Sequence, residues 1–238
     1  HYIKISYTSY INKICDKYLQ TWMRNYTSTD ARPTPLLTGP AWMKKFNSAT
    51  GDPDPKVQAR LAKAMDINYR SGVGELIWAM TTCRPDVAYA SVKLSQANAC
   101  PHKHHFHGVK HALKFLYSTK DDGLYYWRTA PRDEFPVGPL PKINSNKNDL
   151  LLEKRPEYDA NILHAYADLD WASCVKTRRP FGGSCIRLAG GTIAYKSKFQ
   201  PTVAGLSTEA EFMAVYDTTG KDDIICTQHL MGSRHCFI

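Results

Sequence analysis

The fold class follows from a segment that starts with ILHAYADLDW at residues 162–171, which has the pattern of a β-strand. Residues 181–188 and 191–198 predict two further strands, and Ala189-Gly190-Gly191 between them is typical of a hairpin turn. A helix is then expected to begin at residues 207–211 and to run to about Met231. Three consecutive strands followed by a helix favour an α+β order, and we expect the strands to pair antiparallel.

The residues before this stretch predict mainly helices. Residues 38–68 are largely polar, and residues 51–55 (GDPDP) predict a loop. Arg84-Pro85-Asp86 is expected to end one helix and to start the next, since proline is accepted in a first helical turn. The expected elements are a strand at 3–6, a helix carrying Tyr10, Ile14, Tyr18 and Trp22, two helices within 69–99, a helix over 102–118 and a strand at 124–127.

Residues 129–160 mark the best domain boundary. This segment combines Pro131, Pro136, Pro139 and Pro141 with a run rich in Asn and Lys, which is typical of a linker or a long surface loop. We therefore divide the chain into a helical region at 1–128, a linker at 129–160 and an α+β domain at 161–238.

Positive charge is concentrated in the first half of the chain. The sequence holds 31 Lys and Arg against 22 Asp and Glu, a net charge of +9. Residues 1–128 contain 18 basic and 9 acidic residues, whereas residues 129–238 contain 13 of each. A basic half favours a polyanionic partner, most often nucleic acid, although a solvated lysine-rich surface is the alternative.

Other features exclude whole classes of protein. No run of ~18 apolar residues predicts a membrane-spanning helix, and no signal-peptide pattern is present. The seven cysteines are scattered and form no Cys-x-x-Cys motif, which favours free thiols in a reducing compartment over a secreted disulfide framework. We therefore expect an intracellular protein that is not secreted. Since the first residue is His1 rather than Met, we expect a piece of a longer chain.

Two carboxylates are candidate metal ligands. Asp168 lies near the end of the first predicted strand of the α+β domain, and strand alternation puts Asp170 on the same face. Glu211 lies in the first turn of the helix that follows. Packed together, Asp168 and Glu211 suit Mg²⁺, and two such ions ~4 Å apart activate water for phosphodiester cleavage. The alternatives are solvated edge carboxylates and a capping box formed by Thr208 and Glu211.

Basic and imidazole side chains form two weaker candidates. Lys196 and Lys198, with Arg178 and Arg179 upstream, are placed to contact phosphates, although a hairpin of solvated charges explains them nearly as well. A histidine cluster at 102–111 has the spacing of one metal-ligand pair, but no second pair is evident. We therefore favour a helix start over a zinc site.

The order of several motifs resembles the polyprotein of copia-type LTR retrotransposons, from the end of reverse transcriptase into ribonuclease H. The resemblance covers almost the whole chain apart from two variable loops. It is most specific in the last three of the matching blocks, which are YRSGVGEL at 69–76, RPDVAYA at 84–90, YADLDWA at 166–172, KSKFQPTVA at 196–204 and STEAEF at 207–212.

This resemblance implies a helical thumb/connection region followed by a partial ribonuclease H-like mixed sheet with helices. It implies that Asp168 and Glu211 are catalytic metal ligands, that Mg²⁺ is the cofactor, and that the partners are an RNA–DNA hybrid and the rest of the polyprotein. The parent activity would be RNA-directed DNA synthesis with cleavage of the hybrid's RNA strand. The parent protein would act in a cytoplasmic particle or in the nucleus.

The chain also departs from the family pattern. The paired-Asp motif of the polymerase is absent, a third ribonuclease H Asp has no match, and Gly220 interrupts the last predicted helix at about 1 kcal/mol relative to Ala. We therefore expect an incomplete nuclease site and a chain that is inactive alone. The alternatives are a non-catalytic nucleic-acid-binding module and a decayed reading frame.

Overall fold

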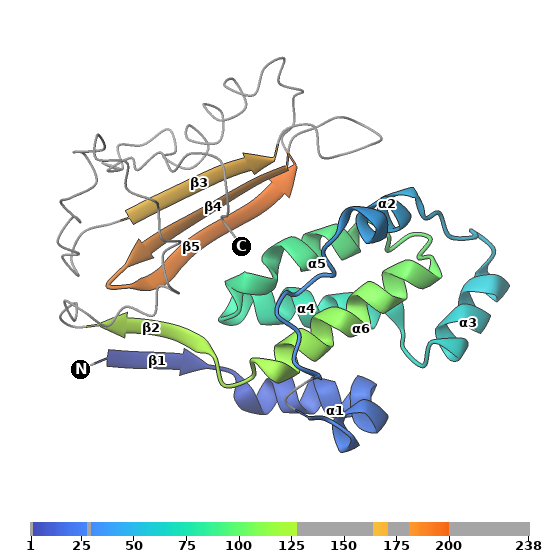
Figure 1. The fold of residues 1–238 in the computed structure, drawn as a ribbon, viewed down its shortest axis with the longest axis horizontal. Helices are drawn as coiled ribbons and strands as arrows, with labels where there is room; N and C mark the ends of the chain where they lie inside the picture. The colour runs from blue at the N-terminus through green and yellow to red at the C-terminus, as the bar shows by residue number, and fades with distance from the viewer. Residues whose placement is uncertain (1, 28–29, 128–163, 171–180, 200–238) are drawn as a thin grey trace, which may run out of the picture.

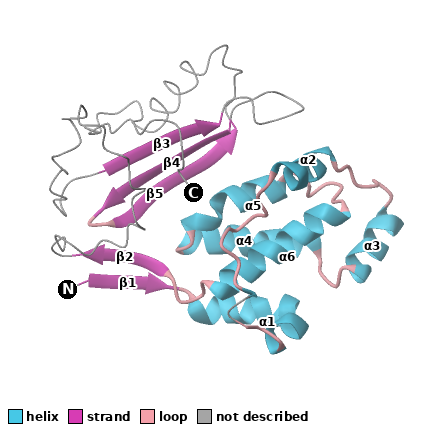
Figure 2. Ribbon diagram, viewed as in Figure 1, coloured by secondary structure: helices cyan, strands magenta, loops and turns pink. Residues whose placement is uncertain are grey.

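The computed structural model describes residues 2–27, 30–127, 164–170 and 181–199. Helices lie on one side of the described fold and two antiparallel sheets on the other (Figures 1 and 2). The α+β class expected from the sequence is confirmed. The linker expected at 129–160 and the helix expected from Ser207 lie outside the described residues.

Six α-helices form the helical body, which the structure describes over residues 8–27 and 30–118. The long periodic segments predicted from the sequence are confirmed as α1, α4, α5 and α6, and a short 3₁₀ turn at Pro85–Val87 links α4 to α5. The bounds are α1 Thr8–Arg24, α2 Pro40–Ser48, α3 Pro55–Ala64, α4 Tyr69–Thr82, α5 Ala88–Ser95 and α6 Lys103–Ser118.

Two helices were not expected within the polar segment 38–68. Pro40 and Pro55 each stand in the first turn of a helix, where the missing N–H of proline costs nothing. The Asp54 side chain caps α3 by accepting a hydrogen bond from the Lys56 amide at 2.9 Å. The turn chemistry at 51–55 therefore marks a loop that is also the start of a helix.

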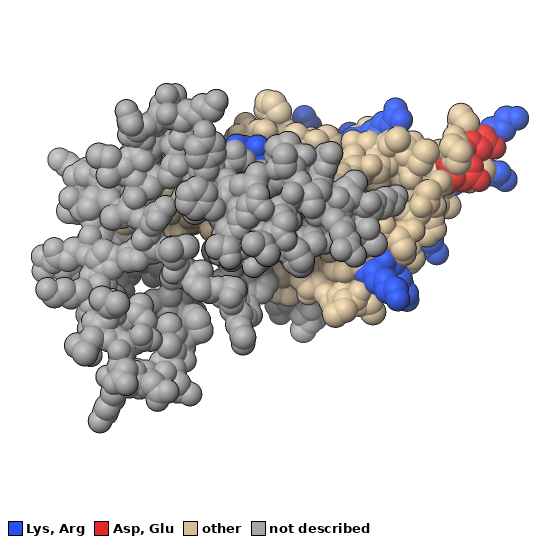
Figure 3. Space-filling view, turned by 90° about the horizontal axis from the view of Figure 1, so that it is seen from above, with Lys and Arg blue, Asp and Glu red and all other residues tan. Residues whose placement is uncertain are grey.

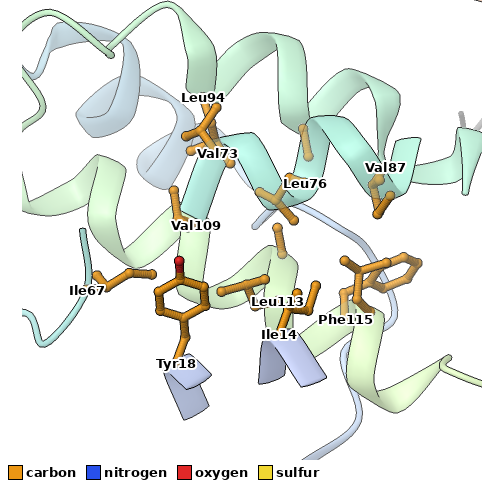
Figure 4. Close-up of a cluster of buried hydrophobic side chains, with 14 of the residues drawn as sticks. Ile14, Tyr18, Ile67, Val73, Leu76, Val87, Leu94, Val109, Leu113 and Phe115 are labelled. Atoms are coloured by element: carbon orange, nitrogen blue, oxygen red, sulfur yellow. The ribbon is translucent and has the colours of Figure 1, made fainter. Parts of the chain in front are cut away.

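The core of the helical body is built around α6 (Figure 4). Val109, Leu113 and Leu116 of α6 are fully buried, at the spacing of three and four that puts side chains on one helix face. Leu76 of α4 and Ile11 of α1 are equally buried in the same cluster. Burial of a Leu-sized side chain stabilises the folded state by about 2 kcal/mol, so this cluster is what holds the helices together.

A buried arginine ties the link between α4 and α5 to the end of α6. The Arg84 side chain is almost completely buried, and its guanidinium donates hydrogen bonds to both carboxylate oxygens of Asp86. It also donates to the carbonyl and the hydroxyl oxygen of Thr119, which caps α6. These bonds satisfy the buried charge and fix the segment that the sequence identified only as a helix boundary.

The strands form two antiparallel sheets. β1 (Tyr2–Ser6) pairs with β2 (Gly123–Trp127), and β3, β4 and β5 form a three-stranded sheet in that order. The antiparallel pairing expected for these three strands is confirmed. Ala189 and Gly190 form the β4–β5 turn with φ of 52° and 81°, the paired positive values of a tight hairpin. The bounds are β3 His164–Asp170, β4 Phe181–Leu188 and β5 Gly191–Phe199.

The three-stranded sheet packs against the rest of the fold. The Tyr126 hydroxyl of β2 donates to the Thr192 carbonyl of β5 at 2.7 Å. The Tyr195 hydroxyl of β5 donates to the Met80 carbonyl of α4, and the Phe181 ring lies 5.0 Å from the Tyr89 ring of α5. The sheet therefore contacts the helical body through one of its two faces.

Candidate nucleic-acid interface

Asp168 lies on an exposed part of β3, and the register fixes what shares its face. It lies opposite Gly183 of β4, which lies opposite Ser197 of β5. Directly opposed residues of antiparallel strands have side chains on the same face of the sheet. Gly183 adds no side chain between Asp168 and Ser197 on that face.

The face that carries Asp168 is the one turned toward the helical body. Tyr195 is two residues from Ser197 and therefore points to the same side as Asp168. Phe181 is two residues from Gly183 and shares that side as well. Because Tyr195 and Phe181 contact α4 and α5, Asp168 belongs to the inward face of the sheet.

The two lysines of β5 lie on the other face. Lys196 is opposite Ser184, and Lys198 is opposite Gly182. Each lysine is one residue away from Ser197, which shares the face of Asp168. Neighbouring residues in a strand point to opposite faces. The structure therefore does not bring Asp168 and these lysines to one surface, and any phosphate contact they make is on the outer face.

The remaining sequence candidates for this site are Glu211, Arg178 and Arg179, and they lie outside the described residues. The pairing of Asp168 with Glu211 therefore stays a prediction. Within the described ranges no group of three or more His, Cys, Asp or Glu side chains is arranged to hold a metal ion. Asp168 is exposed on β3, and its carboxylate fits the role of one oxygen ligand for Mg²⁺.

The histidine cluster builds the start of α6. The His102 ring accepts a hydrogen bond from the His104 amide, and the His105 ring accepts one from the His102 amide at 2.9 Å, a reciprocal cap. The His111 ring contacts the Thr34 carbonyl at 3.0 Å, and burial lowers the pKa of that imidazole. The preference for a helix start is confirmed by these contacts.

The sequence reasoning missed a basic face on α6. The solvent side of this helix carries Lys103, His107, Lys110 and Lys114, which we call the α6 stripe. Their spacing of four, three and four places them on one helix face. The signal was visible in the sequence, because KHHFHGVKHALKFLYS contains no Asp or Glu.

Two side chains of the α6 stripe, Lys114 and His107, have lowered pKa values. The pKa of Lys114 lies below its usual range, first because of burial and then because of Arg32 and Lys110. The pKa of His107 is lowered by burial and by Lys103 and other positive neighbours. On the face seen in Figure 3, Lys and Arg are spread along the visible helical body, whereas the visible acidic side chains gather at one end.

Sequence comparisons show which known proteins the chain is similar to. It is 32% identical over 154 residues to secreted RxLR effector protein 161 of Plasmopara viticola, covering 65% of this chain and 88% of that protein. It is 29% identical over 211 residues to the retrovirus-related Pol polyprotein from transposon TNT 1-94 of Nicotiana tabacum. It is 30% identical over 194 residues to the Pol polyprotein from transposon RE2 of Arabidopsis thaliana. The chain belongs to one family with the first of these proteins, and it is similar to part of the two Pol polyproteins.

The matches cover most of this Pol-related chain but a small part of the transposon relatives. They span 88% and 82% of the chain, yet only 13% of the tobacco polyprotein and 10% of the Arabidopsis one. The chain therefore corresponds to a fragment of a retrotransposon Pol polyprotein. No protein-family model and no solved structure matches it. In the described part of the Pol-related chain, no helix is long and apolar enough to cross a membrane.

Proposed function

We propose that this chain is the reverse transcriptase thumb/connection and ribonuclease H region of a copia-type Pol polyprotein. Its role in the parent protein is to hold the RNA–DNA hybrid by its phosphates while the polyprotein copies RNA into DNA and removes the RNA strand. We place the parent protein in a cytoplasmic particle or in the nucleus.

One observation carries this proposal. The whole net charge of +9 resides in residues 1–128, which form the helical body with β1 and β2, while residues 129–238 are neutral. Like charges gathered on one folded unit repel one another, and a polyanion relieves that repulsion. The RNA–DNA hybrid is the polyanion that the Pol relationship favours.

The nuclease part of the proposal rests on Asp168 and Glu211. Mg²⁺ held by carboxylates supplies an activated water and stabilises the oxygen that leaves a phosphodiester. In this chain Asp168 would provide one oxygen ligand from the inward face of the sheet, and Glu211 is proposed as the second ligand. Two carboxylates hold roughly one ion, so we assign cleavage to the complete polyprotein and expect none from these 238 residues alone.

Binding to a labelled RNA–DNA hybrid in Mg²⁺ at increasing salt tests both parts. We expect weak binding with little sequence preference, because phosphate contacts carry no base information. The logarithm of affinity should fall linearly with the logarithm of salt concentration. Denaturing electrophoresis of the same samples should show an intact RNA strand.

Two outcomes would contradict the proposal. An affinity that does not change between low and moderate salt would show that phosphate contacts do not drive the binding. Mg²⁺-dependent cleavage that is lost in both Asp168→Asn and Glu211→Gln would show that the isolated chain is a nuclease. The alternative of a purely non-catalytic binding module predicts the same binding, and it gains support if extending the chain through the family's next strand restores no cleavage.

A further inference from the structure

Three aromatic rings lie beside the C-terminal end of the α6 stripe. Trp22 of α1, Tyr26 after it and Tyr117 of α6 form what we call the aromatic cluster. Their ring centroids lie 5.0 to 5.7 Å apart, and the rings meet edge to face. Trp22 and Tyr117 pack against the edge of the core, but all three side chains are partly exposed, so the aromatic cluster also reaches the surface.

Lysines already lie against these rings. The Lys114 ammonium is 5.0 Å from the Trp22 centroid, and the Lys120 ammonium is 4.6 Å from the Tyr117 centroid. Lys114 also belongs to the α6 stripe, so the basic row and the aromatic rings form one continuous surface. The negative charge of Asp30 acts to raise the pKa of Lys114, against the larger effects that lower it. The Asp30 carboxylate accepts hydrogen bonds from the amide and the hydroxyl of Thr27.

We propose that the α6 stripe and the aromatic cluster bind a single-stranded stretch of nucleic acid, the stripe holding phosphates and the cluster stacking bases. The inference rests on the proposed function and deepens it, because a base offers its face to an aromatic ring only when it is unpaired. A duplex would use the phosphate contacts alone.

The dimensions of the surface suit a short single strand. Lys103 and Lys114 are eleven residues apart, which is about 16 Å along a helix rising 1.5 Å per residue. A stacked strand, which advances by about 3.4 Å per nucleotide as in a duplex, covers that length in about five nucleotides, and a more extended strand covers it in fewer. Sites of roughly 4 to 16 nucleotides are usual for single-strand binding surfaces that combine basic grooves with aromatic rings.

Fluorescence anisotropy of a labelled oligothymidylate of about ten nucleotides, with the full chain and a salt series, tests the phosphate contacts. Replacing two lysines that contact phosphates should reduce the log–log salt slope by about 1.4, since each contact on a single strand contributes about 0.7. The variant is Lys110→Gln/Lys114→Gln. Its control removes the same charge from exposed positions on α3, Lys56→Gln/Lys63→Gln, and should leave the slope unchanged.

A ring variant tests the stacking. Tyr26→Leu keeps an apolar side chain after the end of α1 but removes the ring, and it should weaken oligothymidylate binding about 5- to 150-fold. The same variant should leave affinity for a duplex of equal length unchanged. The control is Trp78→Leu on α4, where the indole is 52% exposed and lies outside the aromatic cluster.

The outcomes separate this inference from the function it rests on. Salt-dependent hybrid binding, together with an oligothymidylate salt slope that is unchanged in Lys110→Gln/Lys114→Gln, would overturn the site and leave the proposed function standing. Equal loss of single-strand and duplex binding in Tyr26→Leu, or no loss of either, would overturn the stacking. A chain that binds no nucleic acid would overturn both proposals.

Discussion

Arg84→Ala is expected to destabilise the fold by about 3 kcal/mol, at the lower end of the range for breaking a buried ion pair. The Arg84 side chain is 2% exposed and makes bonds of 2.6 to 3.0 Å to Thr119 and Asp86. Its removal takes one hydrogen bond from the Thr119 carbonyl and one from the Thr119 hydroxyl, and it leaves a void beside the Phe115 ring. The carbonyl still accepts from the Asp122 amide, and the hydroxyl still donates to the Phe115 carbonyl. The cost stays moderate because the side chain of Asp86 is 41% exposed and returns to water.

Urea unfolding followed by circular dichroism measures this loss. The matched control is Arg70→Ala, because the exposed Arg70 donates one hydrogen bond to the Asn98 carbonyl at 3.0 Å. The control should cost less than about 1 kcal/mol. If both substitutions cost the same, the Arg84 contacts do not hold the α4–α5 link to α6.

Gly108→Val is expected to destabilise the fold by about 2 kcal/mol through overpacking. Gly108 lies where α6 crosses α5, and a Cβ atom there would lie 2.8 Å from Leu94 Cδ2 and 3.4 Å from Phe46 Cε2. Valine adds two further methyl groups beyond that atom. Leu94 and Phe46 must then leave their positions in the core.

Gly74→Val in α4 makes the same change where nothing lies within 4 Å of the added Cβ atom. It should be neutral or stabilising by a few tenths of a kcal/mol, because valine has a better helix propensity than glycine. Thermal unfolding compares the two variants. A loss in Gly74→Val as large as in Gly108→Val would mean that backbone effects of valine, rather than packing at the α5–α6 crossing, set the cost.

Sequence periodicity predicts the long elements of this fold well. Apolar residues spaced three and four apart mark α6 correctly, because burial of one face fixes a helix. The Gly190 turn and its flanking strands are equally readable, since a tight hairpin needs positive φ. Periodicity does not predict the short α2 and α3, because neither buries a long apolar face. Phe46 is the one buried residue of α2, and α3 has none.

The candidate site is harder to read from sequence, because it depends on how elements pack. Strand alternation orders Asp168 and Lys196 along their own strands, but only the pairing register puts them on opposite faces. The aromatic cluster joins Trp22 to Tyr117, which are far apart in the chain and meet where α1 packs on α6. Arg84 likewise looks like part of a helix boundary until its contacts with Thr119 are known.

The central claim is that the helical body holds nucleic acid. Ultraviolet cross-linking of the full chain to an RNA–DNA hybrid with a single-stranded overhang, followed by peptide mapping, tests it most directly. We predict cross-linked nucleotides on peptides from residues 8–120, above all those that carry Tyr26, Tyr117 and the α6 stripe. Cross-links confined to residues 181–199, with none in the helical body, would contradict the account.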